Sequence, residues 1–213
     1  MNKKDTNKHE PNFFVISAPS GAGKTSLVKA LINQTADCKA AISHTTRPKR
    51  SEEIDGRDYY FVSDHDFSEL NAKGGFLESA KVFDYSYGTS LDEAQKIIKS
   101  GKILILEIDW QGALQIKDKY KSAKSIFILP PSLEALRSRL EMRAQDSDET
   151  VEKRMKKAIS ESSKWKNFDY LVENDVFQIA LEAIKEIISG EGQQYLRDVQ
   201  VNKLKPLIER LGS

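Results

Sequence analysis

Residues 18–25 read Ala-Pro-Ser-Gly-Ala-Gly-Lys-Thr, and this short loop constrains the fold more than any other part of the chain. An unbroken apolar run at residues 13–16 precedes the loop, and apolar residues recur at helical spacing over residues 27–32 after it. Glycines let the backbone turn so tightly that successive N–H groups and the following helix start all point at one anion. The order strand, loop, helix therefore predicts a phosphate-binding P-loop in an α/β fold.

Two loop residues have side chains suited to a nucleoside triphosphate. We expect Lys24 to reach the outer phosphates and the Thr25 hydroxyl to ligate Mg²⁺. The loop opens with Ala18 where the usual pattern has glycine, so it can close only if the backbone at Ala18 needs no positive φ. The predicted ATP-binding residues of the loop are Ala18, Pro19, Ser20, Gly21, Ala22, Gly23, Lys24 and Thr25.

Further apolar runs at residues 103–106 and 126–129 alternate with helical segments, which predicts a parallel sheet flanked by crossover helices in a three-layer fold. The expected helices cover residues 91–99, 133–143, 151–163 and 179–188. Glu107 and Asp109 end the strand at 103–106, where a carboxylate can serve the Mg²⁺ or phosphate site. We expect Thr25 and Asp109 to hold Mg²⁺, directly or through water.

Residues 43–90 interrupt this alternation. Short aromatic strands at residues 59–62 and 76–83 surround a helix at 64–73, and Ser63 with Asp66 resembles a capping box at the start of that helix. We interpret the segment as a small inserted α+β lobe.

The composition narrows the choice of partners. Lys plus Arg number 33 and Asp plus Glu 32, so we expect no overall attraction to nucleic acid or a membrane. The apolar runs are too short to cross a bilayer and the first residues lack the apolar stretch of a secretory signal, which favours a cytoplasmic location. The single cysteine, Cys38, cannot form an internal disulfide, and the three histidines show no metal-ligand spacing.

A last amphipathic helix is expected beyond residue 190, because Leu204, Leu207, Ile208 and Leu211 share one helical face. This face can pack either on the core or on a second copy of the chain, so a homo-oligomer formed through the C-terminal tail is one expectation.

Five further blocks occur in the same order as in guanylate kinases of the bacterial type, and the chain resembles that family over residues 12–189. The resemblance implies a core of residues 12–42 and 91–189 that holds ATP, a GMP-binding lobe at 43–90, a helical lid at about 137–156 and a C-terminal tail at 190–213. It also implies transfer of the γ-phosphoryl group of ATP to GMP, giving ADP and GDP. The blocks are Ser43-His-Thr-Thr-Arg-Pro-Lys-Arg50, Gly56-Arg-Asp-Tyr-Tyr-Phe-Val62, Phe76-Leu-Glu78, Tyr87-Gly-Thr-Ser90 and Glu107-Ile-Asp-Trp-Gln-Gly112.

The resemblance also implies a GMP site whose side chains suit the ligand. Arg47 and Arg50 can clamp the monophosphate through planar guanidinium groups. The carboxylate of Glu78 can accept the N1–H and amino donors of guanine, a donor pair that adenine lacks. The implied GMP-binding residues are Ser43, Arg47, Arg50, Tyr59, Glu78, Tyr87, Gly88, Thr89 and Asp109.

Phosphoryl transfer depends on positioning and on neutralising charge around the γ-phosphate, so cations carry the chemistry. The catalytic residues implied are Lys24, Arg47, Arg139, Arg143 and Arg154. Asn174 resembles the family residue near the adenine of ATP. Ala144 replaces a glycine that the family commonly has in the lid, and Val176 replaces a second acidic residue beside the adenine.

Two other functions remain possible on the sequence alone. Asp109 and Gly112 satisfy the short D-x-x-G pattern of GTPases, but the chain has no N-K-x-D segment to hold guanine in the manner of that class. Guanylate kinase-like modules can also bind proteins without catalysis after their phosphate loop has decayed. Lys24, Arg47 and Glu78 are all present here, so an enzyme is favoured.

Overall fold

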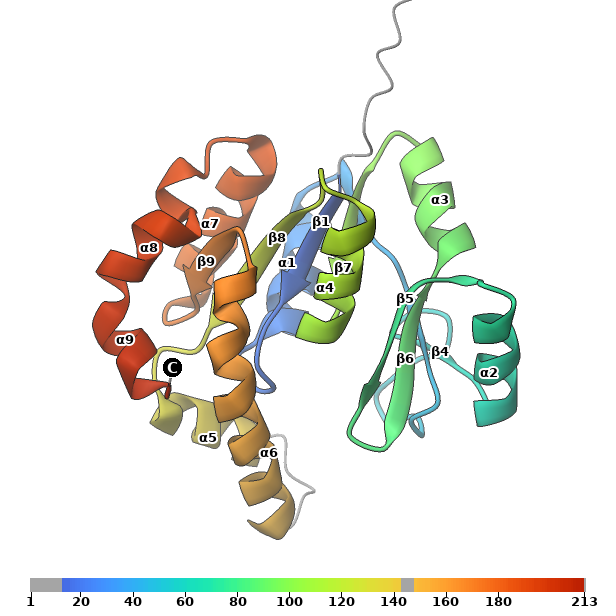
Figure 1. Ribbon diagram of the computed structural model, residues 1–213, viewed down its shortest axis with the longest axis horizontal. Helices are drawn as coiled ribbons and strands as arrows, with labels where there is room; N and C mark the ends of the chain where they lie inside the picture. Colours follow the sequence, from blue (N-terminus) through green and yellow to red (C-terminus); the bar gives the residue numbers. More distant parts are fainter. Residues whose placement is uncertain (1–12, 143–147, 213) are drawn as a thin grey trace, which may run out of the picture.

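The computed structural model describes residues 13–142 and 148–212 and contains two sheets with helices packed around them (Figure 1). The larger sheet is parallel throughout, in the order β2-β7-β1-β8-β9, which places the strand that leads into the phosphate loop at its centre. Its strands are β1 (Phe13–Ser17), β2 (Cys38–Ala40), β7 (Ile103–Glu107), β8 (Lys124–Leu129) and β9 (Tyr170–Glu173).

Helices cover both faces of the parallel sheet. Phe14 and Ile16 of β1 pack with α1 (Lys24–Gln34) and α7 (Phe177–Ser189) on one face. Phe13 and Val15 pack with α3 (Leu91–Lys99) and α4 (Trp110–Lys119) on the other face. Because both faces are buried, the strands read as unbroken apolar runs, and the predicted three-layer α/β fold is confirmed.

The second sheet belongs to residues 43–90, which we call the small lobe. Its order is β4-β3-β6-β5, with a single helix, α2, packed on it through the rings of Phe67 and Phe76, 4.6 Å apart. Ser63 caps α2 by accepting a hydrogen bond from the Asp66 N–H, as the sequence predicts. The elements are β3 (Ser43–Thr45), β4 (Tyr60–Phe61), α2 (Asp64–Ala72), β5 (Phe76–Val82) and β6 (Tyr85–Ser90).

A pair of helices, α5 (Leu133–Met142) and α6 (Asp148–Ser162), packs beside the phosphate loop. The two helices share a small core of their own, and η1 (Ser163–Asn167) follows α6. Arg143 and Ala144 lie in the segment between the helices, outside the described residues.

The C-terminal segment forms η2 (Gln193–Tyr195), α8 (Arg197–Lys203) and α9 (Lys205–Arg210) instead of the single helix expected. Pro206 lacks a backbone N–H, so it is tolerated in the first turn of a helix but not in a helix interior. α9 therefore begins as a new helix after Leu204, with Pro206 in its first turn. The apolar face made by Leu204, Leu207, Ile208 and Leu211 is buried in the core of the same chain. Self-association through the tail stays a prediction from the sequence. No helix among the described residues is long and apolar enough to span a membrane.

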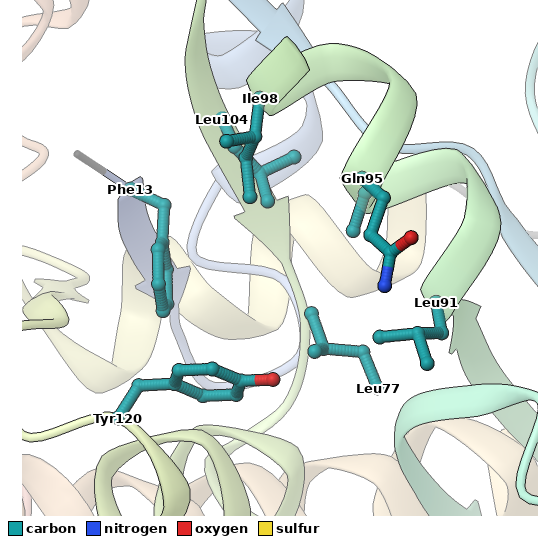
Figure 2. A pocket seen from close by; sticks show the side chains of 8 residues that line it. Phe13, Leu77, Leu91, Gln95, Ile98, Leu104 and Tyr120 are labelled. Carbon is teal, nitrogen blue, oxygen red and sulfur yellow. The ribbon is translucent and has the colours of Figure 1, made fainter. Parts of the chain in front are cut away.

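A cavity of about 170 Å³ lies where the small lobe joins the parallel sheet. Figure 2 shows Phe13, Leu104 and Tyr120 from the core on one side and Leu77 and Leu91, from β5 and the start of α3, on the other. We call this space the seam cavity. It is lined mainly by apolar side chains, so the contact between the two sheets is incompletely packed at this point.

Candidate active site

The phosphate loop leaves the end of β1 and enters α1 at Gly23, which is the N-cap of that helix. Gly21 and Gly23 have φ values of +89° and +92°, a left-handed conformation in which glycine avoids the strain that other residues suffer. Among the described residues other than glycine, only Phe83 has a positive φ. Ala18 therefore takes an ordinary backbone conformation. The loop therefore closes although it opens with alanine.

Neighbouring elements hold the loop from outside. The Asn174 Nδ2 donates to the Ala22 carbonyl at 2.8 Å, and a Cβ added at Gly23 would lie 2.5 Å from the same Nδ2. Arg139 of α5 donates to the carbonyls of Asn174 at 2.9 Å and Ala22 at 3.4 Å. The structure thus brings Asn174 and Arg139 to the phosphate loop, where both bind its backbone.

Lys24 and Thr25 both reach toward the end of β7, the strand next to β1. The Lys24 Nζ donates to the Ile108 carbonyl at 2.9 Å, and the Thr25 hydroxyl donates to Glu107 Oε1 at 2.5 Å. The Asp109 carboxylate instead caps α4, accepting from the backbone N–H groups of Gln111 and Gly112, both at 3.0 Å. Of the two acids that end this strand, Glu107 is the one that contacts Thr25.

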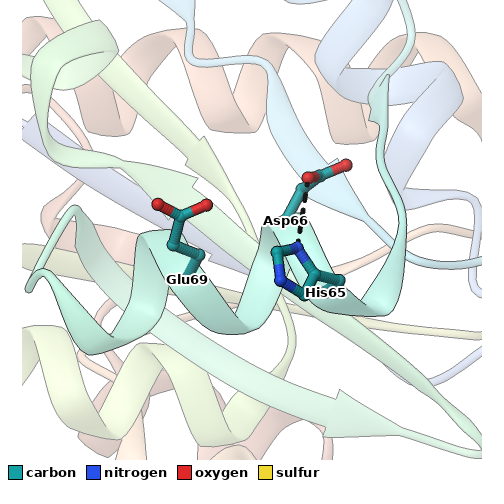
Figure 3. A group of neighbouring side chains, drawn as sticks. All are labelled: His65, Asp66 and Glu69. Atoms are coloured by element: carbon teal, nitrogen blue, oxygen red, sulfur yellow. Dashed lines mark ion pairs between the residues drawn. The ribbon is translucent and has the colours of Figure 1, made fainter.

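The donor set at the loop suits Mg²⁺. The ion prefers oxygen ligands, and the Thr25 hydroxyl and the Glu107 carboxylate supply oxygens beside the nest that attracts phosphate. A second group of potential ligands, His65, Asp66 and Glu69, lies on α2 with its ligand atoms within 4.8 Å of one another (Figure 3). These side chains are exposed, and Asp66 and Glu69 are already engaged by Ser63 and Lys73. The α2 group is therefore no candidate for the nucleotide metal.

A buried carboxylate marks the site in the small lobe. Glu78 on β5 is 4% exposed, and its Oε1 accepts from the Thr89 N–H at 3.0 Å and the Thr89 hydroxyl at 2.7 Å. Ser43 Oγ lies 3.4 Å from Thr89 Oγ1. Burial raises the pKa of Glu78 to about 7, although the hydrogen bonds from Thr89 act in the opposite direction.

Gly112 makes room for this carboxylate, and Gly88 makes room for the neighbouring ring of Phe76. A Cβ added at Gly112, in the first turn of α4, would lie 2.3 Å from Glu78 Oε2. A Cβ added at Gly88 on β6 would lie 2.9 Å from the ring of Phe76. Gly112 was not among the site residues predicted from sequence, although it closes the block that begins at Glu107.

Arginine and aromatic side chains form a second cluster in the small lobe. The guanidinium of Arg47 donates to Glu53 Oε1 at 2.7 Å and lies 5.6 Å from the centre of the Tyr59 ring, and the Tyr59 and Tyr87 rings are 6.0 Å apart. The Arg50 N–H donates to Glu53 Oε2 at 2.8 Å. Burial raises the pKa of Tyr59, and the Glu107 carboxylate acts in the same direction.

The structure does not describe one of the predicted catalytic residues, and it shows three residues at the site that the sequence did not predict. Arg143 lies outside the described residues, and Arg154 is half-buried on α6. Glu53, Gly112 and Glu161 contact predicted site residues but were not predicted themselves. Glu161 lies 141 residues from Ser20 and accepts its backbone N–H at 3.1 Å. Only the tertiary structure reveals such a contact, whereas Glu53 could have been suspected from its closeness to Arg47 and Arg50 in sequence.

A P-loop on the central strand of a parallel sheet, with lysine and threonine directed at the next strand end and a second lobe across from them, defines a P-loop kinase fold. The family model described as guanylate kinase matches residues 10–191. The chain belongs to the guanylate kinase family.

Individual relatives agree with this membership. A protein of Coxiella burnetii named guanylate kinase is 49% identical over 203 residues, which are 95% of this chain and 98% of that protein. A guanylate kinase of Pseudomonas fluorescens is 50% identical, with 93% and 96% covered. The crystal structure of guanylate kinase from Anaplasma phagocytophilum is similar with a TM-score of 0.71 at 28% identity, covering 92% of this chain and 95% of that chain.

Proposed function

We propose that this protein transfers the γ-phosphoryl group of ATP to GMP, giving ADP and GDP. Its membership of the guanylate kinase family supports this reaction. The observation that carries the choice of acceptor is the buried carboxylate of Glu78, held by Thr89 and facing the helix turn at Gly112.

Guanine is selected because it offers two adjacent donors, N1–H and the exocyclic amino group, to a carboxylate. Among the described residues, the hydrogen bonds to Glu78 end on Oε1, so Oε2 is left to accept from the base. Ser43, Gly88 and Thr89 complete the base site, and Asp109 raises the negative charge near it. Adenine would leave a buried carboxylate without donors, which discriminates by up to ~10⁴-fold to 10⁵-fold.

The phosphate of GMP binds in our proposal to Arg47 and Arg50, with hydroxyl groups from Tyr59 and Tyr87. Glu53 now pairs with Arg47 and also accepts from the backbone of Arg50. A dianionic phosphate offers the same two arginines more acceptor oxygens in a bidentate geometry, so it can replace Glu53 as their partner.

ATP binds in our proposal to the phosphate loop, residues 18–25, with Asn174 beside it. Thr25 and Glu107 would hold Mg²⁺, and Asp109 would contribute through its position at the same strand end. Mg²⁺ neutralises charge on the phosphate oxygens when it is bound. Lys24 would leave the Ile108 carbonyl to bind the outer phosphates.

Cations complete the site. Lys24 of the core and Arg47 of the small lobe are assigned to the transferring group, and Arg139, Arg143 and Arg154 to the helical lid at about 137–156. Arg139 binds the backbone of the phosphate loop and therefore shapes it as well as adding charge. Closing the lid excludes water that would otherwise hydrolyse ATP.

The proposed role of each segment of the chain follows from the residues just assigned. Residues 12–42 and 91–189 form the ATP-binding core, residues 43–90 bind GMP and residues 190–213 are the C-terminal tail. A cytoplasmic location is part of the proposal, and the buried free thiol of Cys38 is compatible with a reducing compartment.

A coupled assay tests the proposal directly. ADP formation is measured with ATP, Mg²⁺ and one acceptor at a time: GMP, dGMP, AMP or UMP. We expect rapid turnover with GMP and none above background with AMP or UMP. Equal turnover of AMP would show that Glu78 does not read the base, and no turnover with any acceptor would favour a non-catalytic role.

A further inference from the structure

A lysine on α6 contacts the small lobe at a place where no substrate-binding residue has been assigned. The Lys157 Nζ lies 3.8 Å from the centre of the Phe83 ring. Phe83 is at the tip of the hairpin that joins β5 to β6, where Val82 pairs with Tyr85. A cation over an aromatic face is attracted by the negative charge of the ring. α6 and the small lobe are therefore connected through this pair.

The backbone conformation at Phe83 is unusual for an aromatic residue. Phe83 has a φ of 54°, and it is the only described residue other than glycine with a positive value. Two-residue hairpins favour glycine at such a position because a Cβ there is strained. A bulky aromatic residue thus stands where glycine would fit the turn better, and its ring contacts Lys157.

The same face of α6 contacts the phosphate loop one turn further along. Lys157 Nζ lies 3.7 Å from Glu161 Oε1, and Glu161 Oε2 accepts the Ser20 backbone N–H at 3.1 Å. Glu161 is 7% exposed, so this carboxylate is held in a site largely closed to water. Burial raises its pKa, while the Ser20 hydrogen bond and the Lys157 charge favour the charged form. The contacts Phe83, Lys157, Glu161 and Ser20 form a continuous chain, which we call the α6 bridge.

The α6 bridge joins the two binding regions of the proposed reaction. Its first residue lies on the hairpin that carries Glu78 and Thr89, and its last residue lies in the phosphate loop. Arg154, assigned to the lid, precedes Lys157 by three residues and Glu161 by seven, a spacing that places all three on one side of the helix. The α6 bridge therefore connects the small lobe to the phosphate loop and to the helix that carries Arg154.

We propose that Lys157 and Glu161 are positioning residues of the kinase: Lys157 fastens α6 to the tip of the small lobe, Glu161 fastens α6 to the phosphate loop, and through them GMP and ATP strengthen each other's binding. This inference rests on the proposed function. It assigns neither residue to the transferred phosphoryl group. Linkage requires that the strengthening is reciprocal.

The test measures the dissociation constant of GMP by calorimetry with and without a saturating non-hydrolysable ATP analogue and Mg²⁺. The ratio of the two constants is the coupling factor. We expect a factor above one for the unchanged protein and a loss of about threefold to tenfold in Lys157→Met, which keeps the length of the side chain but removes its charge. Lys157→Arg should restore the coupling because a guanidinium can contact both the ring and the carboxylate.

Two further variants separate positioning from a general loss of structure. Lys156→Met removes a neighbouring exposed lysine of the same helix and should keep the coupling factor of the unchanged protein. Phe83→Gly removes the ring while relieving the strained turn, so it should lose the coupling without lowering the thermal midpoint. Combining Phe83→Gly with Lys157→Met should cost no more coupling than Lys157→Met alone, because Lys157→Met already breaks the contact with the Phe83 ring.

The proposal is overturned if Lys157→Met keeps the full coupling factor, if Lys156→Met loses as much, or if the unchanged protein shows no coupling. Turnover identifies which inference has failed. If the unchanged protein does not phosphorylate GMP, the proposed function fails as well. Normal phosphorylation with unaltered coupling in Lys157→Met and Phe83→Gly rejects the α6 bridge alone.

Discussion

The Thr25 hydroxyl donates a hydrogen bond of 2.5 Å to Glu107 Oε1, which ties the start of α1 to the end of β7 across 82 residues of sequence. β1, which leads through the phosphate loop into α1, and β7 are neighbours in a parallel sheet, so their carboxyl ends lie at the same edge. The pair thus links the phosphate loop to the strand that leads toward α4 and the small lobe.

Glu107→Gln should weaken the use of Mg²⁺. The amide keeps an acceptor for Thr25 but removes the negative charge that favours a divalent cation, so the Mg²⁺ concentration for half-maximal rate should rise by about 10-fold to 100-fold. Titration of the rate with MgCl₂ measures this. Glu173→Gln, at the end of β9, is the matched control, and an equal shift in that variant would contradict the role of Glu107.

Lys24→Ala should remove turnover and leave the fold intact. The ammonium acts on phosphate charge that grows during transfer, so kcat/KM should fall by about 10²-fold or more. The coupled assay and a circular dichroism spectrum together check this. A folded variant with unchanged activity would show that Lys24 does not contact the phosphates.

The affinity for GMP should depend on pH through Glu78. Because burial raises the pKa of Glu78 to about 7, the carboxyl is increasingly protonated as pH falls below that value. A protonated carboxyl cannot accept both guanine donors, so the KM for GMP should rise between pH 8 and pH 6. Glu78→Gln serves as the control, since its profile retains only the titration of the substrate phosphate near pH 6.

Glu78→Gln should also stabilise the protein at alkaline pH while impairing its activity. Glu78 has a raised folded pKa, so its contribution to stability is present below about pH 4.5 and is lost as pH rises through about 7. Glu78→Gln should therefore increase the free energy of unfolding at pH 8 by about 1–3 kcal/mol, and the difference should shrink toward pH 5. Urea denaturation at both pH values tests this against Glu52→Gln, an exposed acid of the same lobe.

Gly112→Ala should damage GMP binding specifically. The added Cβ would lie 2.3 Å from Glu78 Oε2, so the carboxylate must move from its position beside Thr89. We expect a loss of about 1–3 kcal/mol of stability and at least a tenfold rise in the KM for GMP. Leu114→Ala, an exposed position on the same helix, controls for helix changes. An unaltered KM for GMP would mean that the base does not enter beside Gly112.

Much of the fold could be predicted because both faces of the parallel sheet are buried. The runs at 13–16, 103–106 and 126–129 are β1, β7 and β8, and the helix expected at 91–99 is α3. Elements whose burial is mixed were missed. β2 reads Cys-Lys-Ala with one exposed residue, and β3 and β6 belong to a lobe in which much of each strand is only half-buried. α4 was missed because its start, capped by Asp109, coincides with a functional motif.

The site was predicted where a local pattern carries the chemistry and not where distant segments meet. The backbone roles of Gly21 and Gly23 follow from the loop itself. The role of Arg139 at the phosphates stays a prediction, and its bonds to the carbonyls of Ala22 and Asn174 are contacts that no spacing could reveal. Asp109 was expected at the metal, yet it caps a helix, a use that an acid two residues before Gln111 could have suggested.

The seam cavity gives the joint between the small lobe and the core a mechanical character of its own. Close-packed interiors resist compression, whereas a void loses volume when it fills or collapses. Hydrostatic pressure therefore favours arrangements of the two sheets in which the hollow is smaller or hydrated. We therefore expect the angle between the two lobes to change under pressure.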